Sequence, residues 1–194
     1  MKSMKEEIRM SIFLLVMTTI CTLLLAWGNS VYQKALAEKE KELRMDILRT
    51  FGVPFTEDTF FSAFNDAVEI EKDKRTTYYF SLGESKQAAV ITTGSGLWSE
   101  IEIFLLVDIE NETIQELQVL SHGETPGLGG RIEEEWFLDQ FVDLDISEGV
   151  SVVSERADIP GEVDAISGAT RTSDAVMLML NKALDGVMNK NQKE

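Results

Sequence analysis

The sequence predicts an α+β protein: an N-terminal transmembrane helix followed by one largely antiparallel-sheet domain with flanking helices. Apolar and β-branched stretches at 77–82 and 87–92 flank a short polar turn, and so do those at 101–109 and 113–121. Such pairs are typical of β-hairpins, whereas parallel strands need a crossover of about a dozen residues or more. An uncharged apolar run of 18 residues near the N-terminus predicts the membrane segment.

The apolar run extends from Met10 to Trp27 and is long enough to cross a hydrocarbon layer of roughly 30 Å. A cleaved signal peptide is the alternative. We prefer an uncleaved anchor, because the run exceeds the usual ~7–15 apolar residues and no clear small-residue cleavage site follows it. The expected organisation is a tail at 1–9, a transmembrane helix at 10–27, a helical stalk at 28–50 and a domain at 51–194.

Composition or helical spacing predicts four helical segments after the membrane run, at 31–49, 57–71, 131–141 and 174–188. A solvated turn is expected at 71–75 and a final strand at 150–153. The third helical segment should bury Ile132, Trp136 and Phe141. The last helix should bury one apolar face, made of Val176, Leu180, Ala183, Leu184 and Val187.

The composition excludes several classes of function. A net charge of −16 and a pI near 4.5 argue against nucleic-acid binding, which needs lysine and arginine to contact phosphates. Cys21 is the single cysteine and His122 the single histidine, so no structural zinc, iron–sulfur or multi-histidine metal site is expected. Catalysis by a nucleophilic serine is also poorly supported, because His122 is the only imidazole and no G-x-S-x-G motif exists.

An unusual density of hydroxyl side chains precedes the last helix. Ser173 is well placed as the N-cap, and a helix needs only one. The surplus hydroxyls, together with Gly168 and Ala169, suit an anion at a helix N-terminus, and Arg171 could add a cation. From the residues alone, plain capping and phosphate binding both remain open. The four hydroxyl-bearing residues are Ser167, Thr170, Thr172 and Ser173.

Two glycine-rich segments are further candidates for a binding site. The segment 121–130 contains four glycines and a proline, so it turns more than once and could bring its backbone close to a flat ligand. It could also be a long exit loop from a hairpin. The segment 94–99 places Trp98 beside a glycine turn, where it could close a core or form one wall of an aromatic site.

Together, these segments resemble the FMN-binding domain family. Residues 164–170, DAISGAT, resemble its flavinylation motif D-x-x-S/T-G-A-T, with alanine at 165 where glycine is frequent. Residues 122–129 match its H-x-E-T-P-G-L-G loop, and residues 94–98 resemble its G-x-G-L-W element. The resemblance covers roughly residues 10–180. Within the family, the chain is similar to the G subunit of Rnf complexes and more distantly to the C subunit of sodium-pumping NADH:quinone reductases.

The resemblance implies FMN attached to Thr170 through a phosphoester, installed from FAD by a flavin transferase. It also implies a single-pass protein of the cell membrane, with a cytoplasmic N-terminus and an extracytoplasmic flavin domain. The expected function is electron transfer among the membrane subunits of an Rnf-type ferredoxin:NAD complex, as a redox subunit rather than a stand-alone enzyme. The implied cofactor-binding residues are Trp98, Glu124, Thr125, Gly127, Leu128, Ser167, Gly168, Ala169, Thr170, Arg171, Thr172 and Ser173.

The loop 122–130 is expected to tune the flavin ring, with Glu124 directed at the backbone of its own loop. Three rival functions remain open. One is a covalent FMN carrier of a quinone-reductase-like or extracellular electron-transfer system, and another is a non-redox module that binds a phosphate ligand. The third is an acidic interaction module without a chromophore.

Overall fold

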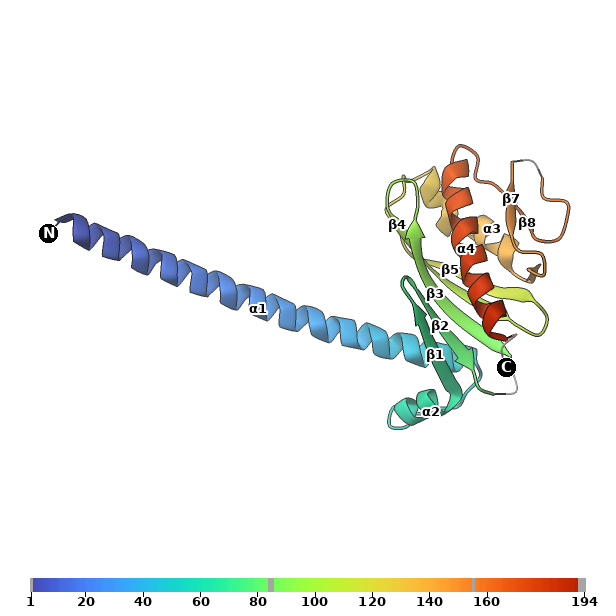
Figure 1. The fold of residues 1–194 in the computed structure, drawn as a ribbon, viewed down its shortest axis with the longest axis horizontal. Coiled ribbons are helices and arrows are strands. Elements are labelled where there is room, and N and C mark those ends of the chain that lie inside the picture. Colours follow the sequence, from blue (N-terminus) through green and yellow to red (C-terminus); the bar gives the residue numbers. More distant parts are fainter. Residues whose placement is uncertain (1, 84–85, 155, 192–194) are drawn as a thin grey trace. The chain divides into compact units, whose positions relative to one another are not determined.

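The computed structural model of the chain describes residues 2–83, 86–154 and 156–191, which form two compact units divided between Asp46 and Ile47 (Figure 1). Helix α1 (Lys2–Thr50) forms the first unit and contributes its last residues to the second. The predicted boundaries of tail, span and stalk therefore lie within one continuous helix. The predicted domain start at residue 51 lies close to the beginning of the second unit.

The N-terminal part of α1 has the properties of a membrane-spanning helix. An 18-residue window of it has a mean hydropathy of 2.2, none of it is buried, and no other described helix is long and apolar enough to span a membrane. The hydroxyls of Thr18, Thr19 and Thr22 donate to main-chain carbonyls three or four residues earlier, at 2.8–2.9 Å. These bonds matter because an unsatisfied polar group is costly in hydrocarbon.

The second unit is built on a six-stranded antiparallel sheet, in which β1 to β6 follow one another in chain order. Both predicted hairpins are confirmed, as β2 with β3 and as β4 with β5. A separate two-stranded sheet pairs β7 with β8 in parallel. The strands are β1 (Val68–Asp73), β2 (Thr76–Ser81), β3 (Gln87–Ser95), β4 (Glu100–Asp108), β5 (Thr113–Ser121), β6 (Leu144–Asp145), β7 (Ser151–Val153) and β8 (Glu162–Asp164).

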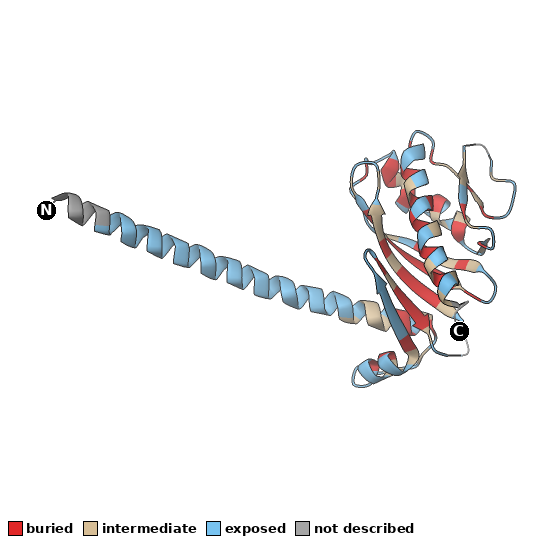
Figure 2. Ribbon diagram, viewed as in Figure 1, coloured by how far each residue is buried: buried red, intermediate tan, exposed pale blue. Residues whose placement is uncertain are grey.

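Helix α4 (Thr170–Asn191) covers one face of the large sheet, chiefly over β3, and Figure 2 shows buried positions along its inner face. The predicted apolar face is confirmed, since all five of its residues are buried. Two glycines allow this close packing. A Cβ on Gly186 would overlap the Tyr78 ring, and one on Gly94 would overlap the Met179 side chain.

The other face of the sheet is also apolar. Tyr79, Ala89 and Leu106 are paired neighbours on adjacent strands, and all three are buried. Because side chains alternate between faces along a strand, they point away from α4. Phe64 of helix α2 (Phe60–Ala67) packs edge-on against Tyr79, with ring centroids 6.3 Å apart. The central strands therefore carry long apolar runs in place of a strict polar alternation.

Two predicted segments differ from the structure in the first half of this unit. The helix expected at 57–71 is shorter, because α2 ends at Ala67 and Val68 begins β1. The turn expected at 71–75 is reduced to Lys74 and Arg75, because β1 and β2 extend to Asp73 and Thr76. Pairing with β2 overrides the helical spacing at Val68, whereas the phenylalanines of the pattern remain in α2.

The helix expected at 131–141 is broken into three short pieces: η1 (Gly129–Glu133), α3 (Glu135–Leu138) and η2 (Asp139–Phe141). Ile132 and Phe141 are buried as predicted. Trp136 remains 39% exposed, and Phe137 occupies the core in its place. The reason is the break itself, since a single helical period no longer applies across Glu134. The Arg131 guanidinium lies 5.0 Å from the Trp136 ring centroid instead.

Candidate functional site

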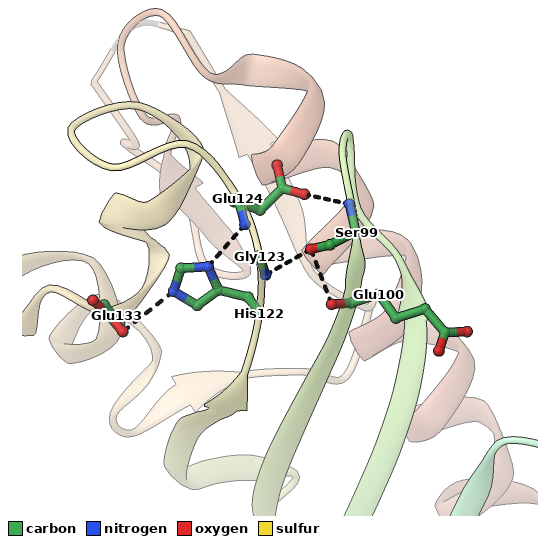
Figure 3. Close-up of polar contacts among 6 residues, drawn as sticks. All are labelled: Ser99, Glu100, His122, Gly123, Glu124 and Glu133. Carbon is green, nitrogen blue, oxygen red and sulfur yellow. Dashed lines mark hydrogen bonds and ion pairs between the residues drawn. The ribbon is translucent and has the colours of Figure 1, made fainter.

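The three motif segments meet at one end of α4. They are the tip of the β3–β4 hairpin at 94–99, the loop at 122–130 and the first turn of α4. The carboxylate of Glu124 lies between them and is only 4% exposed. Figure 3 shows Glu124 directed from its loop toward the hairpin.

Each oxygen of Glu124 is hydrogen-bonded. Oε1 accepts from the main-chain N–H of Trp98 at 2.9 Å and of Ser99 at 3.2 Å. Oε2 accepts from the Thr172 hydroxyl at 2.9 Å. Burial alone would raise the pKa of Glu124, but the hydrogen bonds from Trp98, Thr172 and Ser99 outweigh it and hold the pKa below its ordinary value. The expectation that Glu124 points at its own loop is wrong, because the donors to its carboxylate belong to the hairpin and to α4.

Two glycines leave room for this carboxylate. A Cβ on Gly96 would lie 2.6 Å from Glu124 Oε1, and one on Gly129 would lie 2.8 Å from Oε2 and 2.7 Å from Thr172 Oγ1. Any side chain at either position would therefore displace the hydrogen-bonded group. The two glycines therefore make space for the buried Glu124 carboxylate. Their position in glycine-rich loops does not by itself indicate this role.

The base of the loop is held by a second set of contacts, shown in Figure 3. The Glu124 N–H donates to His122 Nδ1 at 3.1 Å, so that nitrogen carries no proton, and Nε2 faces Glu133 at 3.2 Å. The Gly123 N–H donates to Ser99 Oγ at 2.7 Å. His122 thus orders the loop as a hydrogen-bonding side chain.

The hydroxyl-rich segment divides into exposed and buried members. Helix α4 begins at Thr170, four residues earlier than expected, so Ser173 lies inside its first turns and is not the N-cap. Ser173 Oγ accepts from the Ile166 N–H at 3.1 Å and donates to the Ala169 carbonyl at 3.3 Å. Thr172 and Ser173 are both fully buried, whereas Ser167, Thr170 and Arg171 are exposed.

Two apolar side chains of the other motif segments are also open to solvent. Trp98 is 74% exposed and Leu128 is 47% exposed. Leu128 lies against Gly168, where an added Cβ would be 3.3 Å from its Cδ2, and Gly168 has a positive φ of +77°. Gly127, at φ +74° with open space around its Cα, and Thr125 complete the exposed side of the loop.

The predicted site residues therefore fall into two groups. Those with exposed side chains or backbone can meet a ligand directly. The side chains of Glu124, Thr172 and Ser173 are buried and hydrogen-bonded within the protein instead. They hold the segments of the site together and are not available to a ligand. The exposed group consists of Trp98, Thr125, Gly127, Leu128, Ser167, Gly168, Thr170 and Arg171, while Ala169 is buried.

The chemistry of the exposed group fits a phosphorylated aromatic cofactor. The N-terminus of α4 lies beside the Thr170 hydroxyl, and the positive end of the helix dipole there favours negative charge. Arg171 supplies a cation, while Trp98 and Leu128 offer apolar surface for a flat ring. Among the described residues, no cluster of three or more histidine, cysteine or acidic side chains could hold a metal ion.

Comparison with known proteins shows the family of the chain. Residues 96–185, which contain most of the three motif segments, match the family described as FMN-binding domain. The chain is 31% identical to the G subunit of the ion-translocating oxidoreductase complex of Methanosarcina acetivorans, over 96% of this chain and 97% of that one. The chain therefore belongs to the family of FMN-binding-domain proteins that includes the G subunit of these complexes.

A second group of relatives shares the FMN-binding part. The C subunit of the Na(+)-translocating NADH-quinone reductase of Yersinia pestis is 35% identical over 106 residues, which is 51% of this chain and 40% of that protein. The matched region thus spans less than half the length of that relative.

Solved structures confirm the fold prediction. The C subunit of the Na(+)-translocating NADH-quinone reductase from Parabacteroides distasonis superposes with a TM-score of 0.55 at 24% identity, over 76% of this chain and 90% of that one. NqrC from Shewanella oneidensis superposes with a TM-score of 0.56 at 19% identity, over 81% of this chain and 100% of that one. At these identities the likeness concerns the α+β fold alone.

Sequence reasoning identified the motif segments but missed how they are joined. Glu124 was counted among the cofactor-binding residues with its side chain directed at its own loop, and neither Gly96 nor Gly129 was linked to it. One signal was available: a carboxylate in a glycine-rich loop has few local charges to pair with. Its partners come from residues 25, 26 and 48 positions away in the chain, which sequence spacing does not indicate.

Proposed function

We propose that this chain is a membrane-anchored, FMN-carrying electron-transfer subunit of an Rnf-type ion-translocating oxidoreductase complex. The observation that carries the proposal is the 31% identity to the G subunit across 97% of that protein, combined with an exposed Thr170 at the start of α4. The apolar part of α1 supports membrane attachment. Its proposed orientation has the N-terminus in the cytoplasm and the flavin domain on the outer side.

Thr170 is the proposed attachment point for the cofactor. Its Oγ atom would form a bond to the phosphorus in the FMN half of FAD, the bond between the two phosphoryl groups would break, and AMP would leave. The hydroxyl proton would pass to a base of a flavin transferase, and no electron would be transferred. A phosphoester keeps FMN in place where no FMN pool can refill the site.

The chain's own residues would hold and orient the group. The positive end of the α4 dipole and the Arg171 guanidinium would face the phosphate, and Trp98 with Leu128 would face the ring. Thr125 and Gly127 would bring backbone and hydroxyl donors to the polar edge of the ring, where charge develops on reduction. When bound, FMN supplies one-electron and two-electron redox chemistry, which this chain would relay to other membrane subunits.

Mass spectrometry of the full chain tests the proposal. After co-production with a flavin transferase, the parent should carry one FMN increment in its intact mass, and peptide fragmentation should assign it to Thr170. Thr170→Ala should lose the increment completely, because the nucleophilic oxygen is gone. Ser167→Ala, which removes the other exposed hydroxyl of the segment, should keep it.

Two outcomes would contradict the assignment. An increment on Ser167, Thr172 or Ser173 in the parent would move the attachment point. A parent without any increment, and without yellow colour after denaturation, would favour a non-redox binding module. In that case the proposal that this chain transfers electrons would be wrong.

A further inference from the structure

The segment that carries Thr170 contains three hydroxyl-bearing residues at the start of α4, so something must distinguish them. Thr172 and Ser173 are fully buried, and Thr170 is exposed. Chemically, the hydroxyl groups of Thr170 and Thr172 are equivalent. The distinction must therefore come from how the first turn of the helix is oriented, and this inference rests on the proposed function of Thr170.

Helical geometry links the directions of Thr170 and Thr172. Successive residues of an α-helix are rotated by about 100°, so side chains two positions apart point in roughly opposite directions. When Thr172 faces the interior, Thr170 must face solvent. Whatever holds Thr172 inward therefore also presents Thr170 outward.

Glu124 is the group that holds Thr172. Its Oε2 accepts the Thr172 hydroxyl hydrogen at 2.9 Å, in a bond that joins residues 48 positions apart. An ionised carboxylate only accepts hydrogen bonds, so Thr172 must act as the donor. The lowered pKa of Glu124 keeps it ionised at neutral pH.

Glu124 is itself held in place by residues of the chain. Its Oε1 accepts the N–H groups of Trp98 and Ser99, and the missing side chains of Gly96 and Gly129 leave the space that its two oxygens occupy. One carboxylate thus accepts hydrogen bonds both from the hairpin that carries the exposed Trp98 and from the helix that carries Thr170. Removing it would take hydrogen-bond acceptors from both segments at once.

We propose that Glu124 and Thr172 are positioning residues for the modification of Thr170. The hydrogen bond between them sets the rotation of the first turn of α4, sequesters Thr172 as a competing nucleophile and presents Thr170 to the transferase. Neither residue bonds to FMN.

The test measures both the rate and the site of modification in full-length chains in detergent, with purified flavin transferase, FAD and Mg²⁺. Thr172→Val keeps the side-chain shape but removes the donor, and should slow FMN incorporation at Thr170 by roughly tenfold, the factor that matches one lost hydrogen bond to a charged group. Thr172→Ser keeps the donor and should restore the rate. Glu124→Ala should slow incorporation similarly and place part of the FMN on Thr172.

A matched control separates positioning from general loss of stability. Val187→Ala leaves a cavity at a fully buried position, 15 residues beyond Thr172 along α4. It should destabilise the chain yet leave the rate and the site of modification as in the parent. All rates are compared below the unfolding temperature of the weakest variant.

The inference is overturned if Thr172→Val is modified at the parental rate, or if Glu124→Ala and Val187→Ala slow incorporation equally and modify Thr170 alone. A parent that takes up no FMN overturns the proposed function and this inference with it. A parent modified at Thr170 with unresponsive variants overturns the positioning role and leaves the proposed function intact.

Discussion

The two ends of α4 carry charged networks of different kinds. At the N-terminal end, the buried Glu124 carboxylate accepts hydrogen bonds from two main-chain N–H groups and the Thr172 hydroxyl. At the C-terminal end, the Lys190 ammonium lies 2.6 Å from Glu69 and 3.5 Å from Glu71, and both carboxylates are about half exposed. The Glu124 network is a buried charge surrounded by neutral hydrogen-bond donors. The Lys190 network is a set of ion pairs whose carboxylates are in contact with water.

The difference shows that burial and connectivity matter more than formal charge pairing. Water can replace Lys190 as a partner of Glu69 or Glu71, so the ion pair contributes little net free energy. Water cannot easily replace Glu124, whose donors would be left without acceptors inside the protein. The buried end also joins three segments, whereas the exposed end joins one helix to one edge strand.

Both charged groups keep their charge at neutral pH, because in each case favourable interactions outweigh the effect of burial, although the two pKa values move in opposite directions. Burial would raise the pKa of Glu124, but hydrogen bonds from its donors lower it. Burial would lower the pKa of Lys190, but its hydrogen bond and charge interaction with Glu69 raise it. Four variants test how far the two ends differ, from the largest expected effect on stability to the smallest.

Glu124→Ala should have the largest effect. It leaves the buried Thr172 hydroxyl and the Trp98 and Ser99 N–H groups without their acceptor, and we expect a loss of about 3 kcal/mol in the free energy of unfolding. Urea unfolding of the detergent-solubilised full chain measures it. Glu133→Ala, at the exposed partner of His122, should cost less than about 0.5 kcal/mol. Equal losses in the two variants would contradict the special role of the buried carboxylate.

Gly129→Ala should be the next most harmful change. The added Cβ would meet Thr172 Oγ1 at 2.7 Å and Glu124 Oε2 at 2.8 Å, and such overpacking costs about 2 kcal/mol. Gly127→Asn is the control, because Gly127 has open space around it and asparagine tolerates its positive φ. The same unfolding measurement should show a much smaller loss for the control. A neutral Gly129→Ala would mean that the carboxylate can shift without cost.

The pH dependence of stability should differ between the parent and Glu124→Gln. Because the folded pKa of Glu124 is lowered, the unfolded chain takes up this proton first as the pH falls. The corresponding stability is present above the unfolded pKa of about 4.3 and is lost as the pH falls through the folded pKa. The stability difference between parent and variant should therefore shrink in acid.

Urea midpoints measured from about pH 7 down to about pH 3 would test this. A difference that stays constant across the range would show that Glu124 titrates alike in the folded and unfolded chains. Asp108→Asn serves for comparison, since the pKa of Asp108 is also lowered, by hydrogen bonds from Asn111, in a turn remote from the site.

Lys190→Met should have the smallest effect. Methionine keeps apolar contact with the Phe80 ring, which lies 4.4 Å from the ammonium, and removes both ion pairs. We expect a change within about 1 kcal/mol, and less in high salt, because the carboxylate partners are exposed. Calorimetric melting at two salt concentrations measures it. A loss as large as that of Glu124→Ala would remove the contrast between the two ends.

The parts of the fold that were predictable are those in which local pattern and tertiary environment agree. The hairpins at 77–92 and 101–121 combine β-branched residues with short turns, and the apolar stripe of α4 follows the helical period. Prediction failed where pairing or packing overrode the pattern. Strand β1 is paired with β2 although Val68 continues the helical spacing of α2. The helix predicted around Phe137 is interrupted, and Phe137 is buried in the core.

The sequence by itself determined the long apolar N-terminal helix, the α+β fold, the hydroxyl-rich start of α4 and the likeness to FMN-binding proteins. These depend on composition, periodicity and contiguous motifs, which are local properties of the chain. Only the tertiary structure decided which hydroxyls are exposed and that Glu124 joins hairpin, loop and helix. The reason is that burial and hydrogen bonding between residues 48 positions apart depend on where the chain folds back, and no local pattern records that.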